Sequence, residues 1–123
     1  MILIDTNILL RYALNDHPKL SPKAKGIMLD NEVFIITQVI AETIYVLKGV
    51  YKFTREEIID TLLSIFSMDN VHLEHEEITT IALQEYRDTN FDFVDVLLYS
   101  YNKIKKVSVI TFDKDLDKKL MVL

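Results

Sequence analysis

The chain has 123 residues, half of them hydrophobic, and its 14 basic and 19 acidic residues give a net charge of −5. This length and composition predict a single globular domain spanning residues 1–123 and exclude intrinsic disorder. The lack of cysteine excludes disulfides, thiol catalysis and cysteine-ligated zinc, and the negative charge counts against simple electrostatic binding of nucleic acid.

Short apolar runs alternate with segments of helical periodicity along the chain. The predicted strands are residues 2–4, 33–36, 71–73 and 108–110, with a final edge strand at 121–123. The predicted helices are residues 6–14, 21–30, 37–51, 54–67, 75–88, 92–105 and 113–119. Ser21, Thr37 and Thr54 are the predicted N-caps of three of them, and Thr54 forms a capping box with Glu57. Strands alternating with helices predict an α/β fold with a parallel sheet wrapped by helices.

Four acidic residues lie at positions that are typical of a ligand-binding or active site. Asp5 and Asp113 each follow an apolar strand, and the carboxyl ends of parallel strands form the edge at which α/β proteins bind ligands. Glu42 lies near the start of a predicted helix, and Asp95 interrupts an apolar stretch. Four carboxylates that converge on one pocket repel each other unless a cation holds them together. The sequence therefore predicts a site for Mg²⁺ or Mn²⁺, which prefer carboxylate oxygen and water as ligands.

Each acid also has a plainer structural explanation. Asp5 and Asp113 are suited to cap the helices that follow them, and the helix dipole explains a surface acid such as Glu42. Asp95 is the strongest single candidate, because a buried carboxylate needs a partner. The polar residues beside these acids favour a functional site over helix capping alone. They are Thr6, Asn7, Asp92 and Asp115.

Lys103, Lys105 and Lys106 form a basic cluster near the end of a predicted helix. Cations at that position suit the helix dipole, so a solvated surface explains them. Contact with an RNA backbone is the alternative.

The start of the chain and its apolar runs bear on its location. Met1 leads directly into an apolar run and Asp5, without the basic and apolar regions of a signal peptide. No uninterrupted apolar run approaches the roughly 20 residues that cross a bilayer. We therefore expect a soluble, cytoplasmic protein without a membrane partner.

The order of the acidic motifs resembles that of PIN-domain ribonucleases. The matching segments are Asp5-Thr6-Asn7, Ala41-Glu42, Asp92-Phe93-Val94-Asp95-Val96-Leu97 and Thr111-Phe112-Asp113-Lys114-Asp115. The chain is similar in particular to the VapC-like toxins of prokaryotic type II toxin–antitoxin pairs, over essentially its whole length.

The resemblance implies a three-layer α/β/α sandwich with a central, mostly parallel sheet, and Mg²⁺- or Mn²⁺-dependent cleavage of RNA. It implies that Asp5 and Asp95 are the principal metal ligands and that Glu42 and Asp113 are the remaining catalytic acids. The supporting positions it implies are Thr6, Asn7 and Thr111. It further implies a homodimer and an antitoxin whose extended tail enters the acidic pocket.

Other classes of protein remain as alternatives. A non-catalytic PIN-like module that binds RNA or protein would gain nothing from four clustered acids. A receiver domain pairs two acids after its first strand and has a Lys after its last, whereas this chain has Asp5 alone and Asp113. A haloacid-type phosphatase needs a second Asp two residues beyond the first, where this chain has Asn7. We therefore rank the nuclease first.

Overall fold

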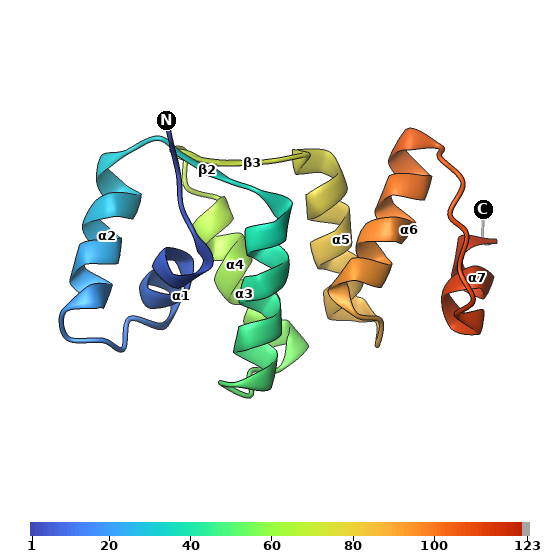
Figure 1. Ribbon diagram of the computed structural model, residues 1–123, viewed down its shortest axis with the longest axis horizontal. Helices are drawn as coiled ribbons and strands as arrows, with labels where there is room; N and C mark the ends of the chain where they lie inside the picture. The colour runs from blue at the N-terminus through green and yellow to red at the C-terminus, as the bar shows by residue number, and fades with distance from the viewer. Residues whose placement is uncertain (122–123) are drawn as a thin grey trace. The chain divides into compact units, whose positions relative to one another are not determined.

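The computed structural model describes residues 1–121, which form a mostly helical α/β fold with a small parallel sheet (Figure 1). The chain divides into two compact units, Met1–Glu74 and His75–Leu123. We call them unit 1 and unit 2. That residues 1–123 act as one domain stays a prediction. The expected edge strand at 121–123 lies outside the described residues except for Met121, which is in a turn.

Unit 1 contains the sheet. Its elements are β1 (Ile2–Leu3), α1 (Thr6–Leu14), α2 (Leu20–Asp30), β2 (Val33–Ile35), α3 (Thr37–Gly49), α4 (Arg55–Phe66) and β3 (Val71–Leu73). The strands are parallel in the order β1-β2-β3, with Ile2 opposite Val33 and Val33 opposite Val71. The sequence prediction of an α/β fold with a parallel sheet is confirmed.

A pair of helices connects each strand of unit 1 to the next, as parallel strands require a crossover. Helix α1 packs against α2, α3 and α4, and α3 packs against α4. Successive strand residues point to opposite faces. Val33, Ile35 and Val71 are buried, whereas Phe34 and His72 between them are half-buried. The core of unit 1 therefore lies between one face of the sheet and the four helices.

Two of the predicted N-caps are wrong, because each residue lies within its helix rather than directly before it. Ser21 lies inside α2, where its buried hydroxyl donates to the carbonyl of Arg11 at 2.8 Å. His17 serves the start of this helix instead, since its Nδ1 accepts hydrogen bonds from the N–H groups of Lys19 and Leu20. Thr37 is the first residue of α3, and its buried hydroxyl has no hydrogen-bond partner among the described residues.

The predicted capping box at the start of α4 is confirmed. The Thr54 hydroxyl accepts from the N–H of Glu57 at 3.1 Å, and the Glu57 carboxylate accepts from the N–H of Thr54 at 2.9 Å. Hydrogen bonds to the Glu57 carboxylate, first from the Thr54 backbone and then from the Thr54 side chain, lower the pKa of Glu57 from its ordinary value of 4.5.

We expect Thr54→Ala to cost about 1 kcal/mol of unfolding free energy at neutral pH, because it removes the cap. A carboxyl group whose folded-state pKa is lowered stabilises the protein above its unfolded pKa and loses this contribution as the pH falls. The difference in unfolding free energy between Thr54→Ala and the wild type should therefore become smaller below pH 4.5. Urea denaturation at several pH values measures it. Thr54→Ser keeps the hydroxyl and is the control; a difference that is constant with pH would contradict this account.

Unit 2 is helical. Its elements are α5 (Glu76–Asp88), α6 (Phe93–Lys105) and α7 (Lys114–Leu120). Helices α5 and α6 form a hairpin, and α7 packs against α6 (Figure 1). Tyr86 and Phe93 meet edge to face at the turn of the hairpin, with ring centroids 6.3 Å apart. This contact holds the start of α6, which carries Asp92 and Asp95, against α5.

The predicted strand at residues 108–110 is wrong for the structure as described. No strand is present there, and Val107 and Ile110 are 48% and 91% exposed. A strand is defined by hydrogen bonds to a neighbouring strand, and the described part of unit 2 contains no other strand. This apolar, β-branched segment therefore has no strand with which to pair in the described part of unit 2.

None of the helices in residues 1–121 combines the length and the apolar character that crossing a bilayer requires.

Candidate functional site

Unit 1 places its predicted site residues around one hollow. It has a volume of about 400 Å³ and is lined by Asp5, Thr6, Asn7, Ile36, Gln38, Val39 and Glu42. We call it the Glu42 pocket. Asp5 lies between β1 and α1, and Glu42 lies in the second turn of α3. The hollow therefore forms where β1 and β2 end and the next helices begin, which is the edge that the sequence predicted.

A hydrogen bond joins two of these residues across unit 1. The Thr6 hydroxyl donates to Glu42 Oε2 at 2.7 Å. Gln38 Nε2 lies 3.4 Å from the other oxygen, Oε1, one turn earlier on α3. Thr6 and Gln38 therefore fix the direction of the exposed Glu42 carboxylate.

Asn7 is held through Arg11. The Arg11 Nε donates to Asn7 Oδ1 at 3.4 Å, and its two terminal nitrogens bind Asp16 Oδ1 at 3.2 Å and the Tyr51 hydroxyl at 3.0 Å. Arg11 is thereby fixed at three points, and it orients the amide of Asn7 at the rim of the Glu42 pocket.

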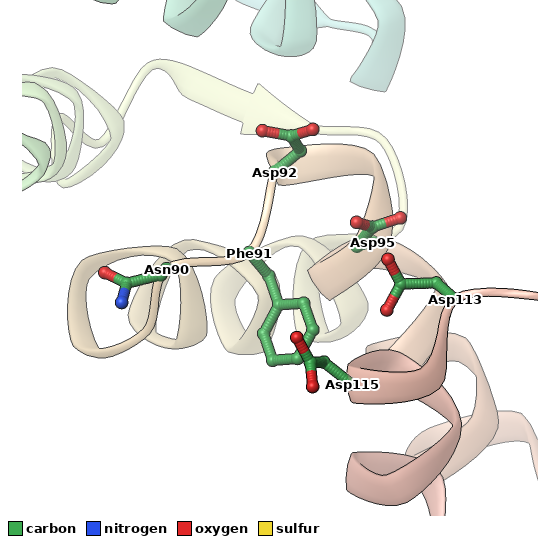
Figure 2. Close-up of a pocket in the computed structure, with 6 residues that line it drawn as sticks. All are labelled: Asn90, Phe91, Asp92, Asp95, Asp113 and Asp115. Carbon is green, nitrogen blue, oxygen red and sulfur yellow. The ribbon is translucent and has the colours of Figure 1, made fainter.

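Unit 2 gathers the other predicted acids around a second hollow, of about 420 Å³. Its lining is Asn90, Phe91, Asp92, Asp95, Asp113 and Asp115 (Figure 2). We call it the aspartate pocket. The carboxylates of Asp95, from the first turn of α6, and Asp113, from the start of α7, lie side by side in Figure 2.

Asp95 is the electrostatically strained member of the aspartate pocket. Partial burial, followed by the negative charges of Asp92 and Asp113, raises its pKa above the ordinary value of 3.8. Each of these causes disfavours the ionised carboxylate. A cation placed among these side chains would offset the repulsion from Asp92 and Asp113.

Asp5 and Asp113 both cap helices, as their plainer explanation predicted. Asp5 Oδ1 accepts from the N–H of Ile8 at 3.0 Å, and Asp113 Oδ1 accepts from the N–H of Leu116 at 2.8 Å. The Thr111 hydroxyl accepts from the N–H of Asp113 at 3.0 Å and so steadies the same segment. Each cap uses Oδ1, so Oδ2 of both carboxylates lies outside the capping hydrogen bond.

The donor groups in both pockets suit a hard divalent cation, because they are carboxylate oxygens of the kind that Mg²⁺ and Mn²⁺ prefer. Within residues 1–121, however, no three acidic or histidine side chains come close enough together to hold an ion as they stand. The gathering of Asp92, Asp95, Asp113 and Asp115 around one hollow is the structural observation that fits a cation. Convergence of Asp5, Glu42, Asp95 and Asp113 on one ion site stays a prediction.

Sequence reasoning missed some of the lining residues. Asn90 and Phe91 line the aspartate pocket, directly before Asp92. Gln38 lines the Glu42 pocket, and its spacing of four residues from Glu42 on one helix was the signal that could have identified it. Ile36 and Val39 add apolar walls that no local pattern marks as part of a site.

Comparison with known proteins identifies the family. The sequence model of the PIN domain family matches residues 2–119, nearly the whole chain. A search of curated proteins finds none that matches. The family match agrees with the α/β fold, with its parallel sheet, and covers all the candidate acids. This chain belongs to the PIN domain family.

Proposed function

We propose that the protein is a metal-dependent endoribonuclease that cleaves RNA phosphodiester bonds in the cytoplasm, as the toxin of a VapC-like toxin–antitoxin pair. PIN domains are generally nucleases, and PIN-domain nucleases generally use divalent metal ions. The observation that carries the proposal is the aspartate pocket, which gathers four aspartates and in which partial burial, followed by the charges of Asp92 and Asp113, raises the pKa of Asp95. Carboxylates crowded in this way are unfavourable in a protein that binds no cation.

In this proposal Asp5 and Asp95 are the principal ligands of Mg²⁺ or Mn²⁺, and Glu42 and Asp113 complete the set. A bound ion of this kind lowers the pKa of water and stabilises negative charge on the leaving oxygen. The protein's own contribution is orientation. Thr6 directs Glu42 through its 2.7 Å hydrogen bond, and the helix caps fix the rotation of Asp5 and Asp113. Asn7, Asp92, Thr111 and Asp115 support these acids.

RNA cleavage with and without a chelator tests the enzymatic part. We expect cleavage of an RNA substrate in Mg²⁺ or Mn²⁺, a fall to background in excess EDTA, and recovery when either ion is restored. Matched reactions with a protease-treated sample show whether the activity belongs to the protein. Cleavage that persists at full rate in EDTA would refute metal dependence.

The hydrogen bond between Thr6 and Glu42 leads to a more specific expectation. Thr6→Val keeps the shape of the side chain but leaves Glu42 Oε2 without the Thr6 hydroxyl. Removing a group that only orients a ligand typically costs roughly 10–100-fold in activity. We expect a loss of that size, with recovery in Thr6→Ser and no change in thermal unfolding. Equal activity in Thr6→Val and the wild type would show that Thr6 does not position Glu42 for the reaction.

The toxin role is tested in cells. Expression of the wild type should arrest growth, and expression of Asp95→Asn should not. A cognate antitoxin should relieve the arrest, and an Arg in its tail would complement the charge of the aspartate pocket. Light scattering tests the expected homodimer. If cells grow normally while the wild-type protein accumulates as an active nuclease, the assignment as a toxin is refuted and the assignment as a nuclease is retained.

A further inference from the structure

The residue before helix α3 does not cap the helix with its side chain. This N-cap residue is Ile36, whose apolar side chain makes no capping hydrogen bond. The first N–H groups of a helix have no partner within the helix and need an acceptor from elsewhere. The Ile36 carbonyl accepts from the N–H groups of Val39 and Ile40 at 3.1 and 3.3 Å. The N–H of Thr37, the first residue of α3, therefore depends on a partner outside the helix.

Glu74 supplies this partner from the end of β3. Its carboxylate Oε1 accepts from the N–H of Thr37 at 3.0 Å, in a partly buried position. A carboxylate at this end of a helix also interacts favourably with the positive end of the helix dipole. Glu74 is thus the N-terminal cap of α3, although 37 residues separate it from Thr37 in the sequence.

The backbone of Glu74 is fixed at the same turn. Glu74 directly follows Leu73, the β3 residue that pairs with Ile35 of β2, and its N–H donates to the carbonyl of Ile35 at 3.0 Å. Figure 1 shows β2 and β3 side by side, with α3 beginning where β2 ends. Glu74 therefore holds the turn between β2 and α3 through its backbone on one side and through its carboxylate on the other.

The turn that Glu74 holds forms much of the Glu42 pocket. Four of the seven lining residues belong to this turn and to the first two turns of α3. They are Ile36, Gln38, Val39 and Glu42. Gln38 directly follows Thr37, and its Nε2 lies 3.4 Å from Glu42 Oε1. Loosening of the first turn of α3 would therefore displace both the apolar wall at Ile36 and the amide that directs Glu42.

We infer that Glu74 is a positioning residue for the reaction, because its cap on α3 holds Gln38 and Glu42 in the orientation from which Glu42 serves as a metal ligand. The inference rests on the proposed endoribonuclease function. Glu74 itself lines neither pocket. Its role is to hold α3, and contact with the metal ion or the RNA is left to other residues.

Amide hydrogen exchange, followed by NMR in the metal-free full chain, tests the cap itself. Glu74→Ala removes the acceptor, so the Thr37 amide should exchange about five-fold faster, the ratio that corresponds to the usual value of a helix cap. Glu74→Gln keeps an oxygen at the same distance from the backbone and should restore the slow exchange. An unchanged exchange rate of Thr37 in Glu74→Ala would show that Glu74 does not cap α3.

Metal affinity tests the effect on the site. Calorimetric titration with Mn²⁺ is compared with RNA cleavage at a series of Mg²⁺ concentrations. We expect Glu74→Ala to bind Mn²⁺ roughly 10–100-fold more weakly, the usual cost of losing a group that orients a metal ligand, and to need correspondingly more Mg²⁺ for half-maximal cleavage. The rate at saturating Mg²⁺ should stay close to that of the wild type, since Glu74 does not contact the reacting groups. Glu74→Gln should restore the affinity.

Thr54→Ala is the matched control, because it removes a cap from α4, which supplies no lining residue to either pocket. It should lower the stability of the protein while leaving its Mn²⁺ affinity unchanged. The positioning role is refuted if Thr54→Ala weakens Mn²⁺ binding as much as Glu74→Ala does, or if Glu74→Ala binds Mn²⁺ like the wild type. If Glu74→Ala does not fold, Glu74→Asp replaces it, since the shorter side chain keeps the charge but does not reach the Thr37 N–H; the same weaker binding is expected.

The two proposals fail in different ways. A wild-type protein that binds Mn²⁺ but cleaves no RNA would refute the proposed function, while the exchange and calorimetric measurements still decide whether Glu74 positions Glu42. RNA cleavage by Glu74→Ala with the Mg²⁺ dependence of the wild type would refute the positioning role alone. A wild-type protein that binds no Mn²⁺ would refute both.

Discussion

Replacing Asp95 by Asn is expected to abolish RNA cleavage and, at the same time, to make the metal-free protein more stable. Asn has the same shape but lacks the charge that a divalent ion requires, so the loss should exceed the roughly 10–100-fold typical of residues that only orient a ligand. Stability should rise because the pKa of Asp95 is raised, so that its ionised form costs folding free energy at neutral pH. Relief of an unfavourable surface charge typically contributes about 0.5–1 kcal/mol.

Two measurements separate these effects. Cleavage is followed in Mg²⁺, and urea denaturation is followed in EDTA and in Mg²⁺. An ion that binds only the folded protein stabilises it, so Mg²⁺ should raise the stability of the wild type and have little effect on Asp95→Asn. Asp30→Asn, at the exposed end of α2, removes the same charge from a residue that lines neither pocket and should behave like the wild type. An active Asp95→Asn protein would end the assignment of this residue as a metal ligand.

Tyr86→Ala is expected to have the largest effect on stability. The side chain is 1% exposed and meets Phe93 edge to face at the α5–α6 turn. Removal of a buried aromatic ring leaves a cavity and costs about 3–5 kcal/mol, a large share of the stability of a small protein. Activity should fall with it, since the same contact supports the segment that carries Asp92 and Asp95.

Matched substitutions identify the ring as the cause. Tyr86→Phe keeps the ring and its contact with Phe93, so it should cost far less than Tyr86→Ala. Gln84→Ala, on the exposed side of the same helix, should change stability by no more than about 0.5 kcal/mol. Denaturant unfolding followed by circular dichroism measures all three. A cost below about 1 kcal/mol for Tyr86→Ala would mean that the α5–α6 hairpin does not depend on this contact.

Local patterns in the sequence were sufficient for most of the fold. The helical spacing of apolar residues predicted each helix to within a few residues, because that spacing is the condition for burying one face. The capping box of Thr54 and Glu57 was predicted correctly because both partners lie within one turn. The caps at Ser21 and Thr37 were predicted wrongly because both hydroxyls are buried, which the local sequence does not reveal. The Ser21 hydroxyl donates to the Arg11 carbonyl, and the Thr37 hydroxyl has no hydrogen-bond partner among the described residues.

The candidate site also shows that local sequence patterns identify local contacts but not contacts between residues far apart in the chain. Asp5 and Asp113 could be recognised from the apolar runs before them, and their capping hydrogen bonds are local. The partner of Thr6 could not be predicted, since Glu42 is 36 residues away and meets it only through the packing of α1 on α3. The strand expected at 108–110 failed for a related reason, because β-branched composition gives a propensity and only another strand can satisfy it.

The capping carboxylates have a practical consequence for preparing an inert protein. Asp5 and Asp113 each hold the first turn of a helix through one oxygen, and the amide oxygen of Asn can accept the same bond. Truncation to Ala would remove charge and cap together, loosening α1 or α7 by about 1 kcal/mol each. Crystals of an uncleaved RNA complex are therefore best sought with Asn at these two positions, so that the frame around the substrate stays as it is in the native protein.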